Sequence, residues 1–336
     1  MNLPNIQIEK SIIPIVWLDT SIITNITIFK ENPDKLQEPQ RSRIDQLYKL
    51  ITKFSQSGRI ICPLADQEDE VWVNRKEWMD TIRELSLGIE CLSLKKIQDN
   101  QLHKAMKSYF LNEESIVLSY LDAFDSDPIE EMRDVLQQEI FLTVENDIFL
   151  GADFRRETNE ITLNLLNEQR EKNVGSGIDF DTQFLAEIDG EIKEIVKMVQ
   201  ELHIGDVGDE RDAFNKMGAS INLYQQLHFW EHITGGKNDI DGLISFYSSS
   251  YNTNCPYVDL SCSLTAKIMI NPQPIKSGDP VDINHISTLM PFSDLFITDK
   301  PWRTFLNNKA YDKKYNTNIA FIGDTEKITD FFDSIA

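Results

Sequence analysis

A short, almost uninterrupted apolar run near the beginning of the chain most constrains what this sequence can fold into. Residues 12–18 read Ile-Ile-Pro-Ile-Val-Trp-Leu, and the run ends at Asp19-Thr20-Ser21. An apolar segment of this length without polar alternation is typical of a strand buried on both faces, and such strands belong to parallel sheets covered by helices. The sequence therefore predicts an α/β fold with an acidic residue directly after its first strand.

Alternating strands and helices follow this run and return near the end of the chain. Apolar residues at helical spacing predict a helix over residues 43–54, which Gly58 closes, and residues 59–62 predict a second short strand. Pro63 suits the first turn of the next helix. In the last third of the chain the same reasoning predicts helices near residues 260–270 and from residue 281, a strand at 295–298, a helix around 302–306, a strand at 319–322 and a helix over 326–335.

The middle of the chain has a different pattern. From about residue 80 to residue 234, long polar segments carry helical periodicity, and none reads convincingly as a strand. A chain of 336 residues also exceeds what one core usually organises. We therefore predict a parallel sheet flanked by helices, built from residues 1–79 and 237–336, with a large all-helical insertion over residues 80–236.

The net charge restricts the partners. The formal charge is −22, whereas a protein that binds nucleic acid normally presents a basic surface. The acidic excess is local, since residues 113–160 hold fourteen acidic side chains against three arginines, which gives −11. Residues 41–59 and residues 300–315 each hold five basic side chains against one aspartate, so each is locally +4. These two stretches are candidates for contact with phosphate, although solvated helix faces often look the same.

Cysteine spacing and hydropathy exclude several classes of protein. Cys62, Cys91, Cys255 and Cys262 form no Cys-x-x-Cys pair, which argues against a structural zinc site and against a disulfide framework. No apolar run approaches the roughly 20 residues that cross a bilayer. The first ten residues also lack the order of a signal peptide. We therefore expect a cytoplasmic protein without a membrane partner.

Acidic residues follow the predicted strands: Asp19 the first, Glu68 and Glu70 the second, Asp299 the strand at 295–298, and Asp324 the last. Asp282 lies in the first turn of its helix, where the helix dipole favours a carboxylate, and His285 lies one turn later on the same face. Ligands bind outside the carboxyl ends of the strands in an open parallel sheet. We therefore expect these acids to converge, far apart in sequence as they are.

A cluster of carboxylates needs compensation. Two such charges about 4 Å apart repel by roughly 4 kcal/mol at an effective dielectric constant of about 20. Mg²⁺ or Mn²⁺ supplies the compensation when a few carboxylates and waters hold it, an arrangement that suits cleavage of phosphodiesters. Asp19 has a simpler alternative role, because aspartate is also a common N-cap and a helix is expected to begin near Ser21.

Four segments resemble the PIN-domain family of metal-dependent nucleases. Residues 15–25 (IVWLDTSIITN) are similar to the family's opening strand with its first metal-binding aspartate, and residues 60–68 (IICPLADQE) to the second strand with the family's glutamate. Residues 278–285 (GDPVDINH) and 290–300 (MPFSDLFITDK) resemble the segments that carry the third and fourth acidic positions. The resemblance covers residues 12–75 and 257–336, and not the middle of the chain.

The resemblance implies a nuclease, with RNA favoured over DNA as substrate and Mg²⁺ or Mn²⁺ as cofactor. It implies that Asp19, Glu68, Asp282 and Asp299 are catalytic metal ligands, and that Glu70 and Asp324 are alternative ligands. Glu70 competes with Glu68, because the family's glutamate usually precedes an aliphatic residue such as Val71. Lys300, Arg303 and His285 are candidates for substrate binding. The helical insertion is a candidate surface for a protein partner or for a second copy of the chain.

Two other functions fit parts of the sequence. Asp19 could be the nucleophile of a phosphatase. Phosphatases of this kind carry an Asp-x-Asp motif, in which the second aspartate serves as general acid. In this chain Ser21 occupies the position of that second aspartate. Alternatively, the chain could be a non-catalytic interaction protein on a PIN-like scaffold, with acids that only increase solubility. A fold that is insensitive to Mg²⁺ and Mn²⁺ would favour that last interpretation.

Overall fold

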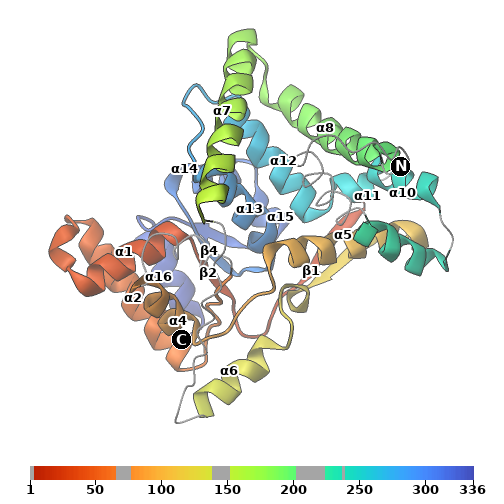
Figure 1. Ribbon diagram of the computed structural model, residues 1–336. Coiled ribbons are helices and arrows are strands. Elements are labelled where there is room, and N and C mark those ends of the chain that lie inside the picture. The colour runs from red at the N-terminus through yellow and green to blue at the C-terminus, as the bar shows by residue number, and fades with distance from the viewer. Residues whose placement is uncertain (1–3, 66–76, 138–151, 202–223, 237–238) are drawn as a thin grey trace. The chain divides into compact units, whose positions relative to one another are not determined.

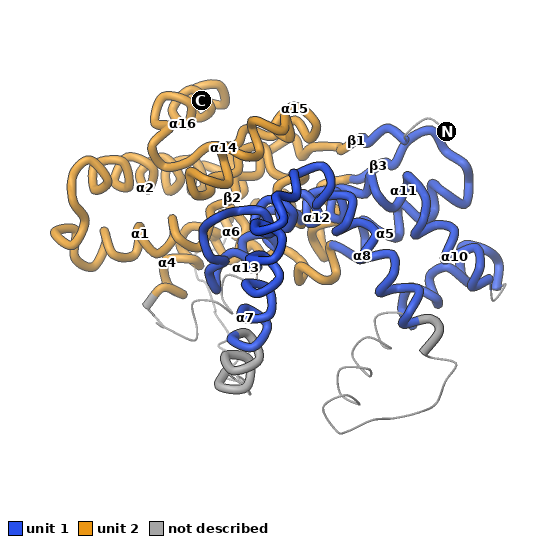
Figure 2. Tube along the Cα trace, turned by 90° about the horizontal axis from the view of Figure 1, so that it is seen from above, with its two compact units in different colours: residues 1–7, 98–118, 155–287 blue, residues 8–97, 119–154, 288–336 orange. Residues whose placement is uncertain are grey.

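The computed structural model describes residues 4–65, 77–137, 152–201, 224–236 and 239–336. Over these residues the chain is a mixed α/β protein in which helices predominate over a few short strands (Figure 1). The chain divides into two compact units (Figure 2). Unit 1 comprises residues 1–7, 98–118 and 155–287, and unit 2 comprises residues 8–97, 119–154 and 288–336.

These units differ from the boundaries expected from the sequence. Residues 119–154, which we expected in the helical insertion, belong to the unit that contains the parallel sheet. Residues 239–287, which we expected in the sheet core, belong to the other unit. Whether residues 80–236 form an inserted domain therefore stays a prediction.

Unit 2 is organised around a parallel sheet. Strands β2 (Val16–Leu18), β4 (Leu295–Ile297) and β5 (Asn318–Ala320) lie in the order β2-β4-β5, and all pairs are parallel. Val16 pairs with Leu295, which in turn pairs with Asn318. The predicted strands at 12–18, 295–298 and 319–322 are thus confirmed, each in part of its length.

Two isolated parallel bridges extend this sheet beyond β2. Ile15 pairs with Ile61, and Leu64 pairs with Glu90. The predicted strand at 59–62 is therefore wrong as a regular strand, because only one bridge forms there. Pro63 explains the interruption: Ile61 donates its N–H to Pro14 at 2.9 Å, but proline has no N–H to continue the ladder two residues later.

Helices bury one face of this sheet. The inward side chains Val16, Leu18, Leu295, Ile297 and Ala320 pack with apolar residues of four helices, in agreement with the period of two along a strand. These helices are α1 (Thr20–Glu31), α2 (Gln40–Gln56), α4 (Glu77–Ser86) and α16 (Thr325–Ser334). The alternate side chains Trp17 and Phe296 are also buried and stack on each other at 6.4 Å. Strands β2 and β4 are therefore buried on both faces, which confirms the prediction made for the strand at 12–18.

The ends of these elements follow local signals. The predicted helix at 43–54 is confirmed as part of α2, and Gly58 follows it with φ of 69°, a left-handed conformation that glycine adopts without strain. Unit 2 also contains α6 (Pro128–Gln137), α14 (Lys300–Asn308) and α15 (Tyr311–Lys314). Helices α14 and α16 confirm the predicted helices at 302–306 and 326–335.

Unit 1 is mainly helical. Its described helices include α5 (Leu94–Leu111), α7 (Ala152–Ser176), α8 (Phe180–Glu201), α10 (Ile240–Tyr247), α11 (Ser250–Thr253), α12 (Pro256–Met269) and α13 (Asp279–Leu289), some of which begin or end in unit 2. Strand β1 (Asn5–Glu9) pairs with β3 (Ser115–Ser119). The prediction that residues 80–236 are all helical is therefore wrong at β3, where only Ile116 and Leu118 are buried, an alternation too short to identify a strand by itself.

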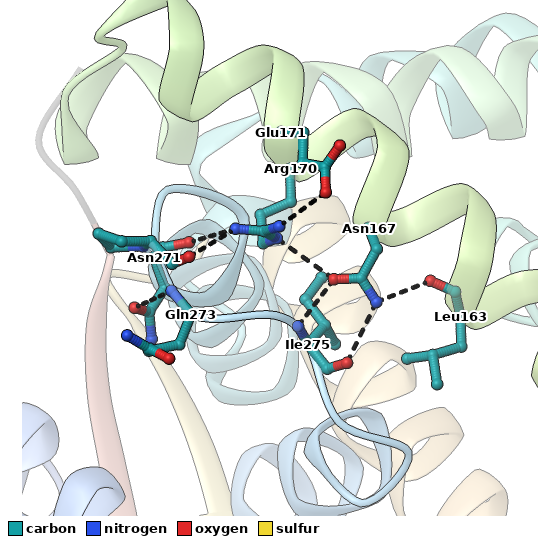
Figure 3. Close-up of polar contacts among 8 residues, drawn as sticks. Leu163, Asn167, Arg170, Glu171, Asn271, Gln273 and Ile275 are labelled. Atoms are coloured by element: carbon teal, nitrogen blue, oxygen red, sulfur yellow. Dashed lines mark hydrogen bonds and ion pairs between the residues drawn. The ribbon is translucent and has the colours of Figure 1, made fainter.

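A group of polar side chains on α7 holds the loop that precedes α13 (Figure 3). The buried guanidinium of Arg170 donates to the carbonyls of Asn271 and Pro272 at 3.0 and 2.9 Å. The amide of Asn167 both donates to the carbonyl of Ile275 and accepts from its N–H, at 3.1 and 2.8 Å. These bonds satisfy backbone groups of the loop and so fix the start of the helix that carries Asp282.

None of the helices in the described ranges is long and apolar enough to cross a membrane.

Candidate functional site

Asp19 lies at the carboxyl end of β2 and caps helix α1. Its Oδ1 accepts a hydrogen bond from the N–H of Ser21 at 2.8 Å, so the N-cap role suggested by the sequence is confirmed. Its Oδ2 accepts from the hydroxyl of Thr298 at 3.1 Å. A carboxylate offers about four lone-pair positions, so these two bonds orient Asp19 and leave it able to bind a cation as well.

Asp299 lies beside Asp19, at the carboxyl end of the neighbouring strand. It follows Thr298, the residue after β4, and its side chain is exposed. Ser21 connects the two acids, because its hydroxyl donates to Oδ1 of Asp299 at 3.3 Å while its N–H binds Asp19. The prediction that Asp19 and Asp299 converge is therefore confirmed for this pair.

The pair occupies a particular place in the sheet topology. Going along the chain, the sheet grows from β2 outward through the bridges at Ile61 and Glu90, and then continues on the opposite side of β2 with β4 and β5. The strand order thus reverses between β2 and β4. In open parallel sheets this switch point leaves a crevice at the carboxyl ends of the strands, where ligands bind.

Asp324 follows β5 at the same edge and is engaged by a cation. Its Oδ1 forms an ion pair with Nη2 of Arg303, and its Oδ2 accepts from the N–H of Phe321 at 3.1 Å. The guanidinium of Arg303 also lies over the ring of Phe321, with its central carbon 4.7 Å from the ring centroid. Lys300 is exposed and lies 5.8 Å from the same ring. Arg303 is therefore held in place, whereas Lys300 projects at the surface.

The described structure gives no position relative to this pair for three of the predicted ligands. Glu68 and Glu70 lie outside the described residues. Asp282 lies in the first turn of α13, as predicted, and belongs to unit 1. There burial lowers the pKa of Lys267 of α12 to about 8, and the negative charges of Asp279 and Asp282 oppose this shift. Asp282 thus shares its surroundings with a cation, and its role as a metal ligand stays a prediction.

His285 is buried in the same helix. Only 7% of its surface is exposed, and burial lowers the pKa of its imidazole to about 4. The side chain is therefore neutral at neutral pH, so it offers no positive charge to a phosphate in this conformation. Its role in substrate binding stays a prediction.

The opposite edge of the sheet has a structural acid. Asp294 precedes β4, and its Oδ2 accepts from the N–H of Ile15 at 2.8 Å. The nearby ammonium of Lys10 donates to the carbonyls of Pro291 and Ser293 at 2.9 and 2.6 Å. Both groups satisfy backbone polar groups at the beginning of the strands, so Asp294 has a structural role.

The chemistry available at the Asp19–Asp299 pair is that of oxygen ligands. Carboxylates and hydroxyls suit hard cations such as Mg²⁺ and Mn²⁺. Over the described residues, no group of three or more His, Cys, Asp and Glu side chains is placed to hold a metal ion, and Glu68 and Glu70 are not among those residues. All four cysteines are buried, and burial raises the pKa of Cys62 and Cys255 to about 12, so neither is an activated nucleophile.

Comparison with models of protein families, with curated protein sequences and with solved structures finds no match to this chain.

Two features of these surroundings were not predicted from the sequence. Lys267 lies beside Asp282, and its signal is a single lysine in the otherwise apolar or small-residue segment 260–270. Phe321 and Gly323 shape the loop after β5, because a Cβ at Gly323 would lie 2.3 Å from the Phe321 ring. A glycine two residues after an aromatic at a strand end is the only local sign of this close approach.

Proposed function

We propose that this chain is a metal-dependent nuclease of the PIN-like type, which hydrolyses phosphodiester bonds of RNA. One observation carries the proposal: Asp19 and Asp299 are bridged by Ser21 at the carboxyl ends of the two strands between which the sheet order reverses. Acids at this position of a parallel sheet are placed to bind a ligand, whereas acids that only increase solubility have no reason to meet there.

The residues at this position fit a hard divalent cation. Asp19 and Asp299 supply carboxylates, Ser21 and Thr298 supply hydroxyls, and the hydroxyl of Thr20 is buried without a hydrogen-bond partner in the described part of the chain. Such a donor set is the one that Mg²⁺ and Mn²⁺ prefer. When bound, the cation would supply an activated water and would offset negative charge at the phosphate.

The protein's own residues have distinct roles in this proposal. Asp19 and Asp299 hold the cation, together with Glu68 or Glu70, as the family resemblance implies. Thr298 and Ser21 fix the carboxylates in one orientation, since a ligand shell that is already oriented loses less entropy on binding. No side chain has to act as a nucleophile, which agrees with the absence of an activated cysteine in the described part of the chain.

Substrate contact is assigned to the basic segment that follows Asp299. Lys300 is exposed at the start of α14, and residues 300–315 carry a local charge of +4 in a protein of charge −22. A local basic surface beside the acids would attract a polyanion to this edge. The choice of RNA over DNA comes from the resemblance to the PIN-domain family.

The test is cleavage of a labelled single-stranded RNA with Mn²⁺, Mg²⁺ or excess chelator. We expect cleavage only with metal, and loss of at least about 100-fold in rate for Asp19→Asn, because a ligand carboxylate is removed. Asp294→Asn, at the opposite edge of the same sheet, is the matched control for removing an acid. Activity in excess chelator, or wild-type activity of Asp19→Asn, would overturn the proposal.

The same purified protein can be used to distinguish a nuclease from the alternative function, a phosphatase. A phosphatase would release phosphate from a small phosphomonoester and leave RNA intact. Asp19 has no second acid at position 21, and Ser21 there binds Asp19 and Asp299 instead. Release of phosphate from a phosphomonoester that Asp19→Asn abolishes, without RNA cleavage, would support the phosphatase.

A further inference from the structure

A pocket lies between α14 and the loop that joins β5 to α16. Its volume is about 370 Å³, within the roughly 300–1,000 Å³ typical of small-molecule sites. Its lining is Arg303, Asn307, Gly323, Asp324, Thr325, Glu326 and Lys327. Because Arg303 is one helical turn after Asp299 on α14, the pocket adjoins the proposed site of cleavage.

One wall of the pocket is a flat cation held rigidly. The Arg303 guanidinium lies over the Phe321 ring and is fixed in that position by its ion pair with Asp324. Gly323 permits this arrangement, since any Cβ there would collide with the ring. About a quarter of the Arg303 side chain remains exposed. A guanidinium plane of this kind is a surface on which a nucleobase stacks.

The polar groups of the lining are balanced between donors and acceptors. Arg303 and Lys327 carry positive charge, and Asp324 and Glu326 carry negative charge, so the lining has no net charge. Two carboxylates disfavour a bare phosphate, and four charged side chains disfavour an apolar ligand. The lining instead suits a neutral, planar ligand that both donates and accepts hydrogen bonds.

We propose that this pocket binds one nucleobase of the RNA substrate beside the bond to be cleaved, and that it prefers guanine. Guanine presents two adjacent donors, N1–H and the N2 amino group, which match a carboxylate such as Glu326. It also presents the acceptors O6 and N7, which match the ammonium of Lys327. Adenine, cytosine and uracil lack this pair of adjacent donors. The inference depends on the proposed function for its substrate, while the pocket itself can be tested without cleavage.

The test is calorimetric titration of the full chain in excess chelator with millimolar 5′-guanylate, 5′-adenylate and inorganic phosphate. We expect guanylate to bind at least about tenfold more tightly than adenylate, the difference typical of a bidentate base contact. Glu326→Gln is expected to remove most of that difference. Asp330→Asn removes the same charge from an exposed residue of α16 outside the pocket lining, and it should leave the preference unchanged. Melting curves of both variants check that each is folded.

The possible outcomes distinguish failure of the guanine-binding proposal from failure of the proposed nuclease function. Equal binding of the two nucleotides, binding of phosphate as tight as guanylate, an unaltered preference in Glu326→Gln, or no binding of guanylate would each overturn the proposal. Guanylate binding that Glu326→Gln weakens would support it, even if metal-dependent cleavage of RNA were absent and the proposed function failed. If RNA is cleaved, Glu326→Gln should also reduce the preference for bonds next to guanosine and retain the dependence on Mn²⁺.

Discussion

The hydroxyl of Thr298 donates a hydrogen bond to Oδ2 of Asp19 over 3.1 Å, joining residues that are 279 positions apart in the chain. Thr298 is completely buried, whereas Asp19 is half-buried. The bond therefore orients an accessible carboxylate from a fixed point inside the sheet. With Ser21 it forms a continuous series of hydrogen bonds from Thr298 through Asp19 to Asp299.

Replacing Thr298 tests whether this orientation matters. Thr298→Val keeps the shape of the side chain and removes the donor to Asp19, so we expect a loss of about 1 kcal/mol in the free energy of unfolding. We also expect the affinity for Mn²⁺ or the rate of RNA cleavage to fall by about 10-fold or more, as for other groups that orient metal ligands. Thr298→Ser retains the hydroxyl and should preserve both. Equal activity of the Val and Ser variants would show that the bond has no functional role.

Replacing Asp299 is expected to change thermal stability in opposite directions without and with metal. In the metal-free protein the charges of Asp19 and Asp299 repel, so Asp299→Asn should melt at a higher temperature than wild type in chelator. Mn²⁺ binds only the folded protein and should stabilise wild type by about 2.7 kcal/mol at 100 times its Kd, and the variant by much less. Asp330→Asn controls for net charge. A variant that melts lower without metal yet gains as much from Mn²⁺ would identify Asp299 as a structural residue.

Asp282 and Asp279 form a matched pair for asking whether unit 1 contributes a ligand. Both charges act on Lys267, but only Asp282 matches the acidic position implied by the family resemblance. If Asp282 is a ligand, Asp282→Asn should reduce the rise in melting temperature caused by Mn²⁺, whereas Asp279→Asn should not. If both variants gain as much as wild type, Asp282 only offsets the charge of Lys267, and our prediction that Asp282 is a metal ligand is wrong.

The lowered pKa of His285 predicts that the free energy of unfolding depends on pH. Its pKa is lowered from 6.5 to about 4 in the folded protein, so between these values the unfolded chain binds a proton that the folded chain does not. The free energy of unfolding should therefore decrease as the pH falls from 6.5 to 4, with about 3 kcal/mol from this residue. His285→Gln should remove that part of the slope in denaturant titrations at several pH values. A slope identical to that of wild type would show that His285 is accessible to protons.

The sequence by itself determined the local elements of unit 2. The continuous run at residues 12–18 predicted a strand buried on both faces, and the spacing of apolar residues predicted α2, α14 and α16. It also placed Asp19 after a strand and before a helix, so that its capping of α1 could be expected. These features depend on neighbours within one or two turns of the chain, which a sequence displays directly.

Only the tertiary structure decided which of these elements meet. The sequence placed acids after several strands, but the adjacency of β2 and β4 brings Asp299 to Asp19, and the contacts of Ser21 and Thr298 follow from it. Strand β3 and the shortened pairing at Ile61 were likewise decided by their partners, β1 and the ladder that Pro63 interrupts. The ion pair of Arg303 with Asp324 has the same origin. Such contacts join residues far apart in the chain, and their stability comes from burial and hydrogen bonding that no local pattern records.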